Sequence, residues 1–140
     1  MEELKIIIIN GPNLNLLGIR EPQIYGRDSF EAFLEQLQLN HPSMTIHYFQ
    51  SNHEGELIDK LHEVGFSYNG IILNPGAYGH TSLALADAIS SIETPVVEVH
   101  ISNIFAREPI RRQSLIANRC VGLITGLGLK GYELALEYFK

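Results

Sequence analysis

Cysteine is almost absent from this sequence. The 140 residues contain one, Cys120, so no internal disulfide can form, and a reducing compartment suits the chain. Cys120 begins an apolar run, CVGLI at 120–124, that is typical of a buried strand. A reactive thiol needs an electropositive and partly exposed setting. We therefore predict a structural role for Cys120.

Long hydrophobic runs are also missing. The longest, residues 4–9, is broken by Lys5 and falls far short of the ~20 apolar residues that cross a bilayer. No charged and then apolar leader precedes it, so we expect a soluble, cytoplasmic protein. Hydrophobic residues make up 45% and charged residues 19%, which indicates a folded chain rather than a disordered one. This length predicts a single domain, residues 1–140, with one site.

Positive charge is in short supply. The net charge is −6, so the chain has no general field that attracts phosphates, and nucleic acid is excluded as a default partner. A small anionic ligand remains compatible with this balance where arginines converge locally.

Strand patterns alternate with helical patterns along the chain. Strands are predicted at residues 5–9, 44–49, 70–73, 96–99 and 120–125. Helices are predicted from apolar stripes at 30–37 and 57–64, over about 81–92, and after Gly131. Asp28 with Glu31 is interpreted as the capping pair of the first helix, and Ser51 with Glu54 as that of the second.

This alternation predicts the α/β class, as a flavodoxin-like three-layer sandwich. Its five-stranded parallel sheet would have the order 2-1-3-4-5. The order reverses between strands 1 and 3, and ligands bind beyond the carboxyl ends of such strands. The site is therefore expected there.

Polar loops follow the first, third and fourth predicted strands. The first loop, residues 10–27, is much longer than the usual connection, which is typical of binding segments and of lids that close over substrate. Within it, Arg20 and Tyr25 form a candidate pair, because a guanidinium close to a phenol lowers its pKa and favours the phenolate. Taken alone, a loop tyrosine such as Tyr25 is more often a packed surface aromatic. Asn13 fits either a turn cap or a site residue.

Two of the six histidines stand apart from the rest. His80 and His100 each follow a strand at the predicted crevice, where an imidazole can donate a proton near pH 7. The other four are expected at surface positions: His41, His47, His53 and His62. No metal-binding spacing is present among them, so no metal is expected.

A glycine-rich segment near the end of the chain resembles a nucleotide motif by letters alone. GLGLKG at 126–131 matches the dinucleotide fingerprint, but it follows the last strand and no acidic residue stands about 20 positions on. We interpret it as a tight turn between strand and helix.

Together these segments resemble one family, the type II 3-dehydroquinate dehydratases. The shared motifs are NGPNLNLLG at 10–18, REP at 20–22, YG at 25–26, QSNHEG at 50–55, NPGAY at 74–78, HTS at 80–82 and EVHISN at 98–103. Any one could arise by chance, but their order and spacing extend over nearly the whole chain.

The resemblance implies a lyase that converts 3-dehydroquinate to 3-dehydroshikimate and water without a metal or organic cofactor. The reaction would serve the shikimate pathway of aromatic amino acid biosynthesis, or quinate breakdown. By carry-over, Tyr25 is the base that removes a proton from C2, as a phenolate favoured by Arg20. Asn13 would stabilise the resulting enolate oxygen. His100 would protonate the departing C1 hydroxyl, with Glu98 in an orienting role.

The resemblance also implies how substrate and subunits are bound. The substrate-binding positions are Asn74, His80, Asp87, Ile101, Ser102 and Arg111. Arg111 suits a carboxylate because its planar fork matches two oxygens at once. Asp87 matches a position that reaches a neighbouring subunit's site, which implies trimers, and the family commonly assembles four trimers into a homododecamer. The expected partners are thus a small-molecule substrate and copies of this chain, with no nucleic acid or membrane.

The sequence departs from the family's pattern at three positions. Gly79 and Ala86 stand where many relatives carry Thr and Arg, and Pro109 replaces a more usual acidic residue. These departures are expected to change local hydrogen bonding, the subunit contact beside Asp87 and the direction in which the Arg111 side chain points.

Three other functions fit the fold but not these loops. A flavin- or phosphate-binding module would favour a hydroxyl-rich first loop. A phosphoacceptor receiver domain would need acidic residues and a lysine where Asn10, Asn74 and Thr125 stand. A structural scaffold would leave the convergence of polar residues unexplained. Schiff-base chemistry is also disfavoured, because none of the lysines is placed for it: Lys5, Lys60, Lys130 and Lys140.

Overall fold

The observed sheet has the predicted strand order. The computed structural model describes residues 3–19, 23 and 29–140. Five parallel strands pair in the order β2-β1-β3-β4-β5. Their bounds are Leu4–Asn10 (β1), Met44–Gln50 (β2), Gly70–Asn74 (β3), Val96–His100 (β4) and Gly122–Thr125 (β5). The flavodoxin-like α/β prediction is confirmed.

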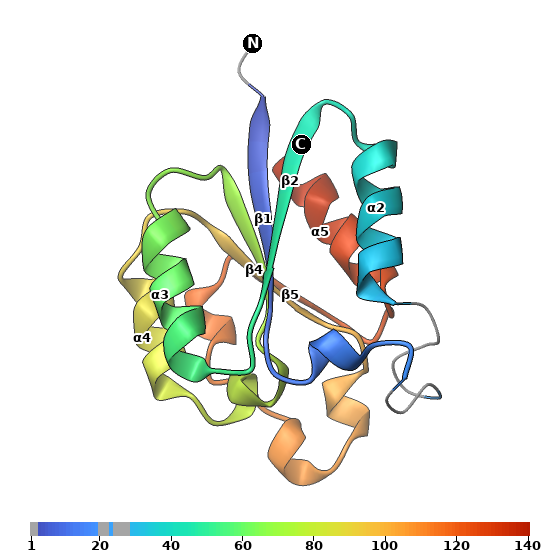
Figure 1. Cartoon of the computed structure of the whole chain (residues 1–140). Helices are drawn as coiled ribbons and strands as arrows, with labels where there is room; N and C mark the ends of the chain where they lie inside the picture. The colour runs from blue at the N-terminus through green and yellow to red at the C-terminus, as the bar shows by residue number, and fades with distance from the viewer. Residues whose placement is uncertain (1–2, 20–22, 24–28) are drawn as a thin grey trace.

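Helices cover both faces of this sheet, as Figure 1 shows. Their bounds are Phe30–Asn40 (α2), Glu54–Val64 (α3), Leu83–Ser90 (α4) and Lys130–Phe139 (α5). α2 and α5 pack on one face, where Phe30 and Tyr132 join the core, and α3 and α4 pack on the other through Leu57 and Leu85. No helix in the described ranges has the length and apolar character needed to cross a membrane.

β1 shows why four isoleucines, residues 6–9, follow one another in its sequence. Ile6 and Ile8 point into the core beneath α2 and α5, whereas Ile7 and Ile9 point into the core beneath α3 and α4. Successive side chains of a strand face opposite sides of the sheet, so a strand covered on both faces needs apolar residues at every position. β1 lies between β2 and β3, and Asn10 at its carboxyl end is fully buried.

The helix starts differ in detail from the predicted caps. α2 is capped by Ser29, whose Oγ accepts from the Ala32 amide at 3.2 Å, while Asp28 lies outside the described residues. At α3 the N-cap is His53, and Ser51 Oγ instead accepts from the His53 amide at 3.0 Å. α4 is shorter than the predicted 81–92, because Ser82 begins it by accepting from the Leu85 amide.

Two burial predictions were wrong. β5 lies at an edge of the sheet, and Val121, just before it, is 51% exposed, so this apolar run is not a buried strand. His41, expected at the surface, is 6% exposed; it follows the last residue of α2, and its carbonyl accepts from the Met44 amide. Cys120 lies partly buried before β5, where burial and the nearby Glu98 charge raise the pKa of its thiol to about 12. A protonated thiol agrees with the predicted structural role.

The glycine-rich segment after β5 is a turn, as predicted. Gly126 and Gly128 have φ of 89° and 62°, in the left-handed region that glycine adopts without strain. α5 begins directly afterwards at Lys130.

Gly11 is a position where the backbones of two loops touch. Its amide donates to the Asn74 carbonyl at 2.7 Å, and a Cβ on Gly11 would lie 2.4 Å from the Pro75 carbonyl oxygen. We expect Gly11→Ala to lower the free energy of unfolding by about 3 kcal/mol, since backbone must move to make room. The urea unfolding midpoint measures this effect.

The control for this substitution is Gly55→Ala in α3. No atom lies within 4 Å of a Cβ there, and alanine favours a helix over glycine by about 0.5–1 kcal/mol. The free energy of unfolding of the Gly55→Ala variant should rise slightly. Equal stability of the two variants would contradict the close approach at Gly11.

Candidate active site

A pocket lies beyond the carboxyl ends of β1, β3 and β4, as the strand order predicts. It collects seven of the predicted site residues: Asn13, Asn74, His80, His100, Ile101, Ser102 and Arg111. They come from three segments far apart in the sequence, which follow β1, β3 and β4, because parallel strands bring their carboxyl ends to one edge of the sheet.

The inner wall of the pocket carries a buried histidine–carboxylate pair. Glu98 and His100 are two residues apart on β4, so their side chains leave the same face of the strand. His100 Nε2 lies 2.5 Å from Glu98 Oε2, and the two side chains are 6% and 0% exposed. Because Nε2 is engaged with the carboxylate, Nδ1 is the nitrogen that can exchange a proton with a ligand.

His80 lies beside this pair, in surroundings that favour its neutral ring. Its ring stacks on that of His100 with centroids 5.7 Å apart. Burial lowers the pKa of His80, and the positive charges of His100 and Arg111 act in the same direction, against the Gln113 carbonyl and Glu98. Nδ1 donates to the Gln113 carbonyl at 2.7 Å. A neutral ring with hydrogen on Nδ1 leaves Nε2 as an acceptor for a ligand hydroxyl.

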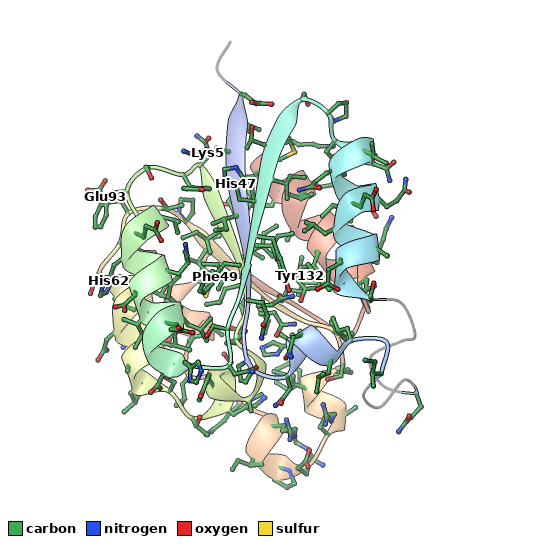
Figure 2. All side chains as sticks on the ribbon, in the orientation of Figure 1. Lys5, His47, Phe49, His62, Glu93 and Tyr132 are labelled. Atoms are coloured by element: carbon green, nitrogen blue, oxygen red, sulfur yellow. The ribbon has the colours of Figure 1, made fainter. Side chains whose placement is uncertain are left out.

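A buried tyrosine, Tyr132, fixes the orientation of the Asn74 side chain. The Tyr132 hydroxyl donates to Asn10 Oδ1 and accepts from Asn74 Nδ2, both at 2.8 Å. Asn74 Oδ1 accepts from the Gly76 amide at 3.1 Å. The second hydrogen on Nδ2 is then the one that Asn74 can donate to a ligand. Tyr132 belongs to α5 and is labelled in Figure 2; its ring lies in the core that α5 shares with α2, in edge contact with Phe30.

Asn13 enters the pocket from the loop after β1. Its φ is 70°, a left-handed conformation to which asparagine is better suited than most residues. The Asn13 amide donates to Asn52 Oδ1 at 2.9 Å, and Gln50 Nε2 donates to the Gly11 carbonyl at 3.1 Å. The end of β2 thus holds the start of this loop in place.

Two arginines line the outer side, one of which sequence reasoning missed. Arg111 ends the short 3-10 helix Pro109–Arg111, so Pro109 begins a helical turn and Arg111 still reaches the pocket. Arg107 also lines the pocket, and its Nη1 donates to Ser102 Oγ at 3.0 Å. The sequence did contain a signal for Arg107, because it stands four positions before Arg111 in the same polar loop.

The two arginines share an exposed carboxylate between them. Arg111 Nε lies 2.8 Å from Glu108 Oε1, and Arg107 Nε lies 3.9 Å away. Hydrogen bonding by its own backbone amide lowers the pKa of Glu108, and the two guanidinium charges lower it further. An exposed pair of this kind is weak, so an anionic ligand can compete for Arg111.

Some predicted positions lie elsewhere. Asp87 is exposed on α4 and does not line the pocket, so within one chain it makes no contact with this site. Arg20 and Tyr25 lie outside the described residues. At Gly79 a Cβ would lie 2.8 Å from Pro75 Cγ and 3.4 Å from His100 Cε1, so a larger side chain would require Pro75 to move.

The fold is that of a flavodoxin-like α/β enzyme, and its pocket carries a buried histidine–carboxylate pair and two arginines. The family model for class II dehydroquinases matches residues 4–140. This chain belongs to that family.

Individual relatives agree with this assignment. The chain is 54% identical to a 3-dehydroquinate dehydratase of an Exiguobacterium species over 96% of this chain and 92% of the relative. It is 53% identical to that of Bacillus subtilis over 94% and 90%. The crystal structure of the type II dehydroquinase of Butyrivibrio crossotus superposes with a TM-score of 0.94 at 45% identity, over 98% and 97% of the two chains. That of Propionibacterium acnes has a TM-score of 0.89 at 36% identity, over the same shares.

Proposed function

We propose that this chain converts 3-dehydroquinate to 3-dehydroshikimate and water by acid–base elimination through an enolate. The observation that carries the proposal is the buried Glu98–His100 pair facing a pocket that also holds Asn13 and Arg111. Relatives named 3-dehydroquinate dehydratase match nearly the whole chain.

Substrate binding is assigned to the polar wall of the pocket. Arg111 takes the carboxylate, because its guanidinium offers two parallel donors. Asn74 donates to a ring oxygen, and His80 Nε2 accepts from a hydroxyl. The backbone around Ile101 and Ser102 completes the contacts. An acidic protein can bind this anion because the arginines converge locally.

The chemistry is assigned to two groups, Tyr25 as the base and His100 as the acid. Tyr25, as a phenolate favoured by Arg20, removes the proton from C2, and the electrons move into the C3 carbonyl to form an enolate. Asn13 stabilises the enolate oxygen. Collapse of the enolate forms the C1–C2 double bond and expels the C1 hydroxyl, which takes a proton from His100 and leaves as water.

Lysine chemistry has no support in this site. All four lysines lie within the described residues, and none lines the pocket. A Schiff-base route needs a lysine amine next to the substrate carbonyl. The elimination is therefore assigned to acid–base steps alone.

Asp87 is assigned to a neighbouring copy's pocket. It is exposed on α4 and lies away from its own pocket, as a residue that serves another subunit must. This role requires the proposed trimers, which would assemble into a homododecamer. A monomeric mass by light scattering would refute it.

The test of the reaction is a direct assay. Purified protein is mixed with 3-dehydroquinate in buffer without added cofactor, and the ultraviolet absorbance of the conjugated enone product is followed. We expect the absorbance to rise in proportion to enzyme concentration. No rise would overturn the proposed function. Borohydride added with substrate should trap no covalent adduct, since an adduct would indicate a lysine imine.

A further inference from the structure

Glu98 places a carboxyl group in a fully buried position. The side chain is 0% exposed, and removing a carboxylate from water is costly unless hydrogen bonds and charge partners replace the water. Two side chains do so here. His100 Nε2 contacts Oε2 at 2.5 Å, and Ser114 Oγ lies 2.8 Å from both Oε1 and Oε2.

The surroundings of Ser114 determine the direction of its hydroxyl. Its Oγ accepts from the amides of Ile116 and Ala117, at 3.3 and 3.1 Å. A serine hydroxyl has one hydrogen and two lone pairs, so with both lone pairs engaged the hydrogen points to Glu98. The next residue ties this segment to the pocket wall, because the Leu115 amide donates to the Gly79 carbonyl at 2.8 Å.

We propose that Ser114 is a positioning residue of the active site, which acts through Glu98 to hold the proton of His100. This inference rests on the proposed dehydration. A hydrogen bond to a carboxylate stabilises its charged form, and a charged carboxylate in turn stabilises the imidazolium. Ser114 therefore keeps Glu98 an acceptor, keeps hydrogen on His100 Nε2, and leaves Nδ1–H directed to the ligand.

Four other ionisable side chains lie around the Glu98–His100 pair: His80, Cys120, Arg107 and Arg111. His80 stacks on His100 and is neutral, because burial lowers its pKa. Cys120 is near Glu98, and its thiol stays protonated. Arg111 and Arg107 line the outer side of the pocket and remain charged. Among the described residues, the side chains in contact with the Glu98 carboxylate oxygens are His100 and Ser114, so these two groups are the ones that act on it directly.

The same serine–glutamate motif occurs elsewhere in the chain without touching the pocket. Ser82 Oγ donates to Glu54 Oε2 and accepts from the Leu85 amide at 2.9 Å. Ser82 is 3% exposed, but Glu54 is only partly buried and has no contact with a pocket residue's imidazole. Ser82→Ala is therefore a matched control, since it removes a buried hydroxyl, a backbone acceptor and a carboxylate donor together.

The kinetic test compares Ser114→Ala, Ser114→Thr and Ser82→Ala. We expect Ser114→Ala to lower kcat for 3-dehydroquinate about tenfold with KM changed less than twofold, the effect of losing one hydrogen bond to a charged group. Ser114→Thr keeps the hydroxyl and should restore most of kcat. Ser82→Ala should keep the wild-type kcat. If Ser114→Ala does not fold, Ser114→Cys replaces it in the test. Because a thiol is a weak donor, the kcat of Ser114→Cys should lie between that of the wild type and the roughly tenfold lower value expected for Ser114→Ala.

A second measurement does not depend on turnover. In protein labelled with ¹⁵N-histidine, the His100 ring signals, assigned by their loss in His100→Asn, should shift towards the neutral ring in Ser114→Ala and not in Ser82→Ala. An unchanged kcat and unchanged ring signals in Ser114→Ala would overturn the inference, as would an equal loss of kcat in Ser82→Ala. If the wild type does not convert 3-dehydroquinate, the proposed function falls, and the ring signals alone decide whether Ser114 holds the proton of His100.

Discussion

Replacing His100 with alanine should lower kcat for 3-dehydroquinate by about 10²- to 10⁴-fold, the usual contribution of a positioned general acid. The C1 hydroxyl is a poor leaving group unless it is protonated as it departs. His100 Nδ1 is the nitrogen available for this step, because Nε2 is bound to Glu98 at 2.5 Å. Substrate binding should change little, since Arg111 and Asn74 remain in place. Steady-state kinetics over a range of substrate concentrations separates the two parameters.

The control for His100 is His62→Ala. His62 is exposed on α3, away from the pocket (Figure 2), so both kcat and KM should match the wild type. A His100→Ala variant with normal kcat and a raised KM would show that His100 binds substrate without acting as an acid. The variant also removes the charge partner of buried Glu98, so its folding is checked by circular dichroism before the kinetics.

Tyr25→Phe should lower kcat by a similar factor, about 10²- to 10⁴-fold, because it removes the proposed base and keeps the ring. A phenol ordinarily ionises near pH 10, so it acts as a base near neutral pH only when a positive charge favours the phenolate. Arg20 is the proposed source of that charge. Arg20→Ala should therefore also lower kcat far more than it weakens binding, and should move the acidic limb of the pH–kcat profile to higher pH.

The control for Tyr25 is Tyr138→Phe. Tyr138 is 60% exposed on α5, far along the chain from the pocket segments, and its hydroxyl should be dispensable. Equal losses of kcat and of substrate affinity in Tyr25→Phe and Arg20→Ala would mean that the two residues only bind substrate.

Much of the site was predictable because it follows from strand ends. Asn10 and Asn74 directly end two apolar runs, and His100 ends a third. In a parallel sheet these ends meet at one edge, so a linear pattern predicts a spatial cluster. The individual roles came from the motifs shared with the family, because composition and spacing do not distinguish a proton donor from a ligand contact.

Other features depended on contacts that no local pattern contains. Ser114 meets Glu98 across 16 positions of sequence, in a segment with no helix or strand pattern of its own. Tyr132 reads as one more apolar residue of the last helix, yet it joins Asn10 across 122 positions. The stripe of a helix predicts which residues are buried but not which polar group a buried hydroxyl will meet.

The sequence by itself determined the class of fold, the order of its strands and the edge at which the site forms, because periodicity, short polar connections and right-handed crossovers leave few arrangements open. Only the tertiary structure decided the burial of His41, the exposure of the strand after Cys120, and the hydrogen bonds that bind Glu98 to His100 and Ser114. These depend on which surfaces meet when the layers pack, and on the direction of a few atoms within about 3 Å of each other. Such directions are properties of the packed chain and not of any segment of it.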